Sequence, residues 1–223
     1  MSKILVFGKN GQVGWELQRS LGLCEDAVFL GREDHGGNLL DVEHLISRIL
    51  DERPEIVFNA AAYTAVDAAE SDQETATKVN TTAVQAMAEA CKHIGALLVH
   101  YSTDYVFDGS GSQAWKESDS INPVNFYGLT KAQGEQAILK SGCSAFIFRT
   151  SWVYGVRGKN FMKTMLRLGK TKAKLGIVSD QIGAPTSAEF IADVSSWLAI
   201  NKRPTNTEII HLVPNGVTSW YEF

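Results

Sequence analysis

Tyr127 and Lys131 lie four residues apart in the segment NFYGLTK, a spacing that could support proton-transfer chemistry. Residues four apart share one face of a helix, so the two side chains would be neighbours if this segment is helical. A phenol has an ordinary pKa of about 10, and a nearby ammonium group is expected to lower that pKa. Such a pair suits general acid–base catalysis on a carbonyl or an alcohol. A tyrosine and a lysine at this spacing also arise by chance. The pair therefore indicates catalysis only if the chain also supplies a nucleotide site and a third polar group nearby.

The third polar group is found where the apolar run ALLVH ends. Ser102, Thr103 and Asp104 follow this run, which reads as a buried strand. Ligands of α/β sheets bind at the carboxyl ends of parallel strands, and a hydroxyl from Thr103 could hold a substrate oxygen there. The alternative is that these short polar residues only cap a turn.

A glycine-rich loop, GKNGQVG, lies between the first apolar run, KILVF, and a helical pattern over residues 12–21. Gly8, Gly11 and Gly14 have the spacing G-x-x-G-x-x-G, which permits a tight turn, close approach of a pyrophosphate and close packing of helix on strand. The free N–H groups of the helix N-terminus would face the phosphates. We therefore predict dinucleotide binding, against the alternative of a glycine-rich turn without a ligand.

The choice of coenzyme depends on the end of the second predicted strand. An acidic residue that would hold a ribose 2′-hydroxyl is not evident there, and Gly31-Arg32 follows Val28–Leu30 instead. Arg32 could accept a 2′-phosphate, which makes NADPH as well as NADH a candidate coenzyme. The alternative is that Arg32 is merely solvated.

Apolar runs and amphipathic stretches alternate along the first part of the chain, which predicts parallel βαβ units. We predict strands at 3–7, 27–30, 55–58, 96–100 and 145–148 and helices at 12–21, 42–50, 75–94 and 127–140. The fold class is therefore α/β, a Rossmann-type doubly wound parallel sheet. Residues 1–155 would form the dinucleotide-binding domain, and residues 156–223, with helices at 160–168 and 188–200 and a strand at 209–213, a smaller substrate lobe.

Composition excludes several other classes of protein. The net charge is −4 and no basic run is present, which argues against a nucleic-acid partner. No apolar run reaches the roughly 20 residues that span a bilayer, and the N-terminal apolar stretch is too short for a signal peptide. Three dispersed cysteines fit reduced thiols in the cytoplasm, and the five histidines have no metal-ligand spacing.

The chain resembles the extended short-chain dehydrogenase/reductases over essentially its whole length. The most specific segments are FGKNGQVGWEL, NAAAYTAVDAAE, HYSTDYVFDG, NPVNFYGLTKAQGE, FRTSWVYG and DQIGAPT. The resemblance implies NAD(P)H-dependent reduction of the 4-keto group of a dTDP-linked sugar, dTDP-4-dehydro-L-rhamnose, with Thr103, Tyr127 and Lys131 as catalytic residues. It assigns coenzyme contacts to Asn10, Gly11, Gln12, Val13, Asn38, Leu39, Ala62, Tyr63, Thr64 and Tyr101, and sugar-nucleotide contacts to Thr103, Asp104, Tyr127 and Trp152.

The same resemblance implies features of assembly. Some family members form a magnesium-linked homodimer through glutamates, one of which corresponds to Glu189. The family usually continues some tens of residues beyond a point such as Phe223, so the substrate lobe looks truncated.

Two other functions remain open at this stage. One is a non-catalytic NADP-binding subunit like the regulatory β subunit of methionine adenosyltransferase, and the other is a sugar-nucleotide epimerase or dehydratase that retains its NAD. Trp152 in RTSWVY favours the reductase, with core packing as its alternative role. Tyr105 follows Asp104 where a dehydratase would have an acidic residue. The segment DQIGAPT suggests a fixed turn in the lobe, without a chemical role of its own.

Overall fold

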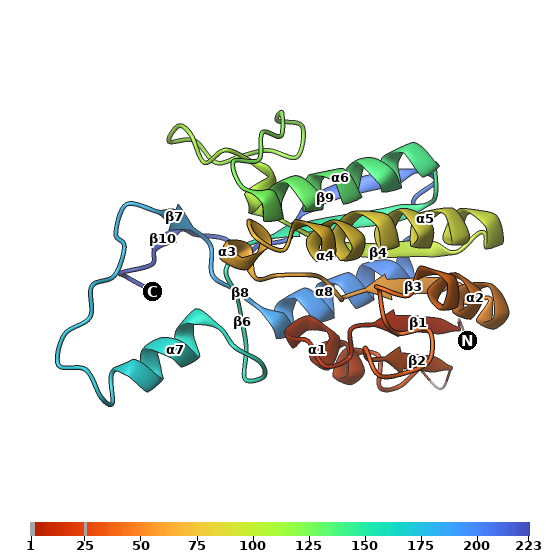
Figure 1. Cartoon of the computed structure of the whole chain (residues 1–223), viewed down its shortest axis with the longest axis horizontal. Helices are drawn as coiled ribbons and strands as arrows, with labels where there is room; N and C mark the ends of the chain where they lie inside the picture. Colours follow the sequence, from red (N-terminus) through yellow and green to blue (C-terminus); the bar gives the residue numbers. More distant parts are fainter. Residues whose placement is uncertain (1–2, 25) are drawn as a thin grey trace.

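Six parallel strands form the central sheet of the computed structural model, which describes residues 3–24 and 26–223 (Figure 1). Their order is β2-β1-β3-β4-β5-β9. The strands are β1 (Ile4–Phe7), β2 (Ala27–Leu30), β3 (Ile56–Asn59), β4 (Leu97–Thr103), β5 (Ala145–Thr150) and β9 (Thr207–His211). From β1 the chain moves to β2 on one side and then to β3 on the other, so the strand order reverses next to the glycine-rich loop. Ligands of doubly wound sheets bind at such a reversal.

Helices cover both faces of this sheet. Successive residues of a strand point to opposite faces, and the two largest apolar clusters of the described residues accordingly lie on opposite faces of the sheet. Helices α2 (Val42–Glu52), α5 (Ala83–Ile94) and α6 (Phe126–Ser141) contribute to the first cluster, for example through Leu45, Met87 and Ile138. Helices α1 (Gln12–Ser20) and α8 (Ala188–Asn201) contribute to the second, for example through Leu17 and Ile191. The predicted α/β fold class is confirmed.

The predicted helix over residues 75–94 is interrupted. It consists of α4 (Gln73–Thr77), a π-helical turn η1 (Lys78–Thr82) and α5, and it follows the short helix α3 (Val66–Ala69). A π turn accommodates an extra residue within a helix and is often found at functional sites. Here the turn contains Asn80, whose side chain is buried.

The segment after residue 155 is divided between the sheet and a small outlying lobe. The sequence placed all of it in the lobe, but β9 pairs with β5 and α8 packs on α1. The lobe consists of α7 (Phe161–Leu168) and pairs of two-residue strands, and Figure 1 shows it set apart from the sheet. In these pairs, β6 (Val153–Tyr154) joins β8 (Thr186–Ser187), and β7 (Ile182–Gly183) joins β10 (Thr218–Ser219).

Two further expectations concern the chain as a whole. In the described residues, we find no helix with both the length and the apolar character needed to cross a membrane. All three cysteines are free thiols; Cys91 and Cys143 are buried, and Cys24 is partly exposed.

Candidate active site

The glycine-rich loop leaves no room for side chains beside β3. Gly8 has a φ of 89°, in the left-handed region, and a Cβ there would lie 2.7 Å from the backbone of Ala60. A Cβ on Gly14 would lie 2.0 Å from the carbonyl oxygen of Gly8, so this glycine lets α1 pack directly on the loop. Gly11, the residue before α1, makes no side-chain cap, which leaves the N-terminal N–H groups of that helix available. These features fit a bound pyrophosphate.

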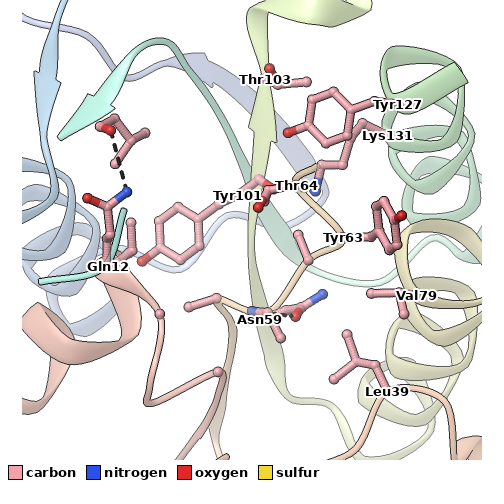
Figure 2. Close-up of a pocket in the computed structure, with 18 of the residues that line it drawn as sticks. Gln12, Leu39, Asn59, Tyr63, Thr64, Val79, Tyr101, Thr103, Tyr127 and Lys131 are labelled. Carbon is pink, nitrogen blue, oxygen red and sulfur yellow. Dashed lines mark hydrogen bonds between the residues drawn. The ribbon is translucent and has the colours of Figure 1, made fainter. Parts of the chain in front are cut away.

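A cavity of about 1050 Å³ opens between this loop, the end of β4 and the lobe. Figure 2 shows its central side chains, with Tyr127 and Lys131 on one side and Gln12 on the other. The cavity brings together nearly all predicted site residues: Gly8, Asn10, Gly11, Gln12, Val13, Arg32, Asn38, Leu39, Ala62, Tyr63, Thr64, Tyr101, Thr103, Asp104, Tyr127, Lys131 and Trp152. Gly14 and Glu189 are the two predicted site residues outside this lining.

Helix α6 presents Tyr127 and Lys131 to the cavity because of how the helix begins. The side chain of Asn125 accepts a hydrogen bond from the Gly128 N–H at 2.8 Å and caps the helix N-terminus. A Cβ on Gly128 would lie 2.2 Å from the carbonyl oxygen of Tyr105, so α6 lies directly against the turn that follows β4. The spacing of four residues then places Tyr127 and Lys131 on the same face, beside Thr103.

Burial determines the protonation of the candidate catalytic groups. It raises the pKa of the Tyr127 phenol well above its ordinary value, and a hydrogen bond with Thr103 opposes this only in part. The prediction that the Lys131 ammonium lowers the pKa of Tyr127 is therefore wrong for this structure. Burial also lowers the pKa of Lys131 to about 8, although Glu135 opposes that shift, and raises the pKa of Asp104 to about 6.

The hydroxyl of Thr103 lies at the junction of these groups. It donates to the Asp104 carboxylate at 3.1 Å and accepts from the Tyr105 N–H at 3.2 Å. Thr103 thus caps the short 3₁₀ turn η2 (Asp104–Val106), which was the structural alternative for these residues. The cap and a role toward a ligand are compatible because the cap uses only an acceptor site of the hydroxyl, so its one proton can turn from Asp104 to a ligand oxygen.

Asn80 supports the cavity in a way that the sequence did not reveal. Its side-chain oxygen accepts from the Tyr63 N–H at 2.9 Å, and its amide nitrogen donates to the Tyr63 carbonyl at 3.0 Å. The same nitrogen donates to the Thr130 hydroxyl on α6 at 3.1 Å. The π turn therefore fixes the strand-end segment Ala62–Thr64 against α6. The available signal was a polar residue among the small and apolar residues of the predicted helix.

The lobe presents Trp152 to the cavity in a constrained conformation. Its φ is 48°, in the left-handed region, which is uncommon for a bulky residue. The indole stacks on Trp220 with ring centroids 3.7 Å apart and planes 14° from parallel. Trp152 is therefore not a residue of the main core.

The segment DQIGAPT positions Trp152. A Cβ on Gly183 would lie 2.6 Å from the indole, so only glycine fits beside the ring. Ser151 donates to the Ala184 carbonyl at 2.8 Å, and Gln181 accepts from the indole nitrogen of Trp220 at 3.2 Å. The sequence alone did not assign a role to this segment. In the structure it contacts the backbone next to Trp152 as well as the indole ring.

Glu189, the predicted metal ligand, lies at the start of α8, and its carboxylate is 3.9 Å from the Arg19 guanidinium. Within residues 3–24 and 26–223 we find no cluster of three or more metal-ligating side chains. A role for Glu189 in metal binding stays a prediction.

Comparisons with known proteins identify the family of this chain. The sequence model of the RmlD substrate binding domain matches residues 2–223. The chain belongs to the RmlD family. The dTDP-4-dehydrorhamnose reductases of Burkholderia thailandensis and Escherichia coli K12 are 48% and 46% identical to it, each over 99% of this chain and 76% and 75% of the relative. The reductase of Bacillus anthracis, solved in complex with NADP, superposes with a TM-score of 0.93 at 34% identity, over 100% of this chain and 78% of that one.

Proposed function

We propose that this chain reduces the 4-keto group of dTDP-4-dehydro-L-rhamnose with NADPH or NADH and forms dTDP-L-rhamnose. The observation that carries this proposal is the convergence of Thr103, Tyr127 and Lys131 on one cavity beside a glycine loop shaped for a pyrophosphate. Membership of the RmlD family and the names of the two reductases given above support the same substrate.

The coenzyme would lie along the sheet edge. The loop residues Gly8–Gly14 would hold its pyrophosphate, Arg32 a 2′-phosphate, Asn38 and Leu39 the adenine, and Ala62–Thr64 and Tyr101 the nicotinamide half. The side-chain oxygen of Asn38 already accepts a hydrogen bond from the Leu40 N–H at 3.1 Å, so its amide nitrogen would make the contact with the adenine. Leu39 is buried and lines the cavity, which suits an apolar contact with a base.

The bound nicotinamide would supply the hydride that reduces C4 of the sugar. Tyr127 would donate its phenolic proton to the oxygen at C4. Its raised pKa keeps the phenol protonated at neutral pH, which suits a general acid in the direction of reduction. Thr103 would hydrogen-bond the same oxygen, and Lys131 would hold the nicotinamide ribose while its charge stabilises the phenolate that remains.

The sugar nucleotide would contact Thr103, Asp104 and Tyr127 on the sheet side and Trp152 on the lobe side. We keep residues 1–155 as the dinucleotide-binding domain, which also carries these four substrate contacts, and residues 156–223 as a partial substrate-binding lobe. The aromatic stack of Trp152 on Trp220 supports a contribution from the second region, because Trp220 positions an indole face that suits a base or a sugar ring.

A nicotinamide absorbance assay with dTDP-4-dehydro-L-rhamnose tests the proposal. Wild type should consume NADPH or NADH, and Tyr127→Phe should lose about 10²- to 10⁴-fold in turnover because the general acid is gone. Tyr221→Phe is the matched control: this side chain is 69% exposed, and turnover should not change.

The assay also separates the other functions that the sequence left open. An epimerase or dehydratase would convert sugar nucleotide without net loss of reduced coenzyme, and a regulatory subunit would bind coenzyme without turnover. Near-normal turnover in Tyr127→Phe would refute the assigned role of that residue.

A further inference from the structure

Three buried polar side chains, one of them the lysine of the proposed catalytic pair, form a hydrogen-bonded chain. Asn59 ends β3, His100 lies opposite it on β4, and Lys131 reaches down from α6, with exposures of 1%, 0% and 2%. Nε2 of His100 lies 3.2 Å from Nζ of Lys131, and Nδ1 lies 3.2 Å from the side-chain nitrogen of Asn59. Lys131 also donates to the Tyr101 carbonyl at 2.7 Å. His100 itself does not line the cavity, but Lys131 and Asn59 do, so His100 can act on a ligand through these two side chains.

The proton on His100 is tied to the charge on Lys131. Burial and the neighbouring ammonium hold the pKa of His100 well below its usual value, so the imidazole is neutral, with one donor and one acceptor nitrogen. An ammonium only donates, so a charged Lys131 requires Nε2 to accept and places the imidazole proton on Nδ1. That proton would then need the Asn59 amide oxygen as its acceptor.

A neutral Lys131 requires the opposite arrangement. Nε2 would carry the proton and donate to the amine, and Nδ1 would accept from the Asn59 amide nitrogen. The Asn59 oxygen then accepts from the Ala61 N–H, at 3.3 Å in the structure. The two arrangements differ in the tautomer of His100 and in the rotation of the Asn59 amide. With a charged Lys131, the Asn59 oxygen accepts from His100 Nδ1 and gives up the bond from the Ala61 N–H, which only the arrangement with a neutral Lys131 keeps.

We propose that His100 is a positioning residue that accepts a hydrogen bond from the Lys131 ammonium through Nε2, keeping Lys131 charged and aimed into the cavity. The part of this inference that concerns the role of the ammonium in catalysis rests on the proposed function. The contact between His100 and Lys131 does not depend on it. A buried ammonium has three N–H groups, and the Tyr101 carbonyl accepts from only one of them, so a second acceptor reduces the cost of desolvation.

Other charges around Lys131 leave this role to His100. Glu135 on α6 favours the ammonium, but its carboxylate is shared with Arg149 of β5 through a bidentate ion pair. Asp104 on η2 acts on Tyr127, and Tyr127 is an uncharged phenol at neutral pH. Burial lowers the pKa of Lys131 to about 8, so loss of one acceptor would shift the ammonium toward deprotonation within the working pH range.

Two amide substitutions at His100 distinguish the role of Nε2 from the role of Nδ1. The amide of His100→Gln reaches the Nε2 position and keeps an acceptor for Lys131, whereas the amide of His100→Asn reaches only the Nδ1 position, toward Asn59. We would follow the side-chain NMR signals of labelled lysine against pH in the full chain without coenzyme, and assign Lys131 by the loss of its signal in Lys131→Met. The same variants would be assayed for the pH dependence of kcat/KM.

We expect the midpoint for Lys131 to fall by about one pH unit in His100→Asn, the size expected for one charge-assisted hydrogen bond, and to stay near wild type in His100→Gln. The alkaline limb of kcat/KM should move with it. Equal midpoints in wild type and His100→Asn, or equal shifts in the two variants, would overturn the proposal.

Wild-type protein provides a measurement that does not depend on how the variants fold. The ¹⁵N signals of His100 should report a proton on Nδ1 below the Lys131 midpoint and on Nε2 above it. A proton on Nε2 at every pH would overturn the proposal. These titrations need no substrate, so the two proposals can fail separately. An absence of reductase activity would refute only the proposed function, and an unchanged tautomer would refute only the role of His100.

Discussion

The two walls of the cavity are built in different ways. The sheet wall is formed by β4, α6 and the glycine loop, and its centre belongs to the core: all seven residues of β4 are buried. The lobe wall, formed by residues 151–187 and 218–223, rests on two-residue strands and aromatic contacts, and no residue of α7 is buried. Trp152 is held there by Trp220 and Gly183 rather than by a packed core.

Because of this difference, substitutions in the two walls should affect different properties: the stability of the fold in one wall and the position of a substrate-binding ring in the other. A polar contact beneath the sheet wall is buried and supports both the fold and the site, so its loss should lower the free energy of unfolding. A contact in the lobe wall supports mainly the position of one ring, so its loss should change substrate binding while the protein remains folded. Three substitutions test this comparison.

The largest effect is expected for Arg149→Met, behind the sheet wall. Arg149 donates to Glu135 at 2.7 and 3.0 Å, and Ser102 donates to the same carboxylate at 2.5 Å. The substitution would leave Glu135 buried without its cation, which should lower the free energy of unfolding by about 3–5 kcal/mol. Urea denaturation measures this change.

Arg203→Met is the control for that experiment, because Arg203 forms an ion pair with Glu55 at 2.9 Å in which both side chains are about half exposed (48% and 53%). Its effect should stay within about 1 kcal/mol. Comparable losses in the two variants would mean that burial does not distinguish the sheet wall.

An intermediate effect is expected for Gly183→Ala in the lobe wall. The added Cβ would lie 2.6 Å from the Trp152 indole, so the ring or the strand has to move. Overpacking of this kind costs about 1–3 kcal/mol, and we expect a rise of about tenfold in KM for the dTDP-sugar. Coenzyme affinity, measured by calorimetry, should stay constant because the glycine loop is untouched.

Gly176→Ala provides the matched change in the same lobe. A Cβ at Gly176 meets no atom within 4 Å, so KM should equal that of wild type. A parallel rise in both variants would show that the lobe responds to any loss of glycine, and that the position of Trp152 is not the cause.

The sheet wall was also the more predictable from sequence. Buried strands such as KILVF and the glycines of the loop depend on local patterning, and their positions agree with the structure to within a few residues. The spacing of Tyr127 and Lys131 sufficed to place both on one face of α6. Local patterns also predicted α7 and α8, but they could not show that β9 returns to the sheet.

Contacts between distant segments escaped prediction. Nothing in the local sequence around His100 indicates that its ring meets Lys131, 31 residues later. The pKa of Tyr127 was expected in the wrong direction because the spacing reveals the neighbouring ammonium but not the extent of burial, which dominates. The need for glycine at position 183 likewise could not be predicted, because it depends on the Trp152 ring that the fold places against it.

The smallest effect is expected at the rim of the sheet wall, where Arg32 is exposed and lines the cavity. If Arg32 contacts a 2′-phosphate, Arg32→Ala should weaken NADPH binding and leave NADH binding unchanged. Solvent screens an exposed contact, so we expect a loss of about 1 kcal/mol, or roughly fivefold in Kd. Calorimetric titration with each coenzyme measures the ratio directly.

Arg167→Ala separates this contact from the general effect of charge. Arg167 is an exposed residue of α7 outside the cavity lining, and its loss changes the net charge by the same amount. Long-range attraction would weaken both coenzymes in both variants, more strongly for the more negative NADPH, and would fade with added salt. A loss confined to NADPH and to Arg32→Ala therefore assigns the 2′-phosphate to Arg32. Equal affinities in Arg32→Ala and wild type would leave Arg32 as a solvated residue and place coenzyme preference elsewhere on the sheet wall.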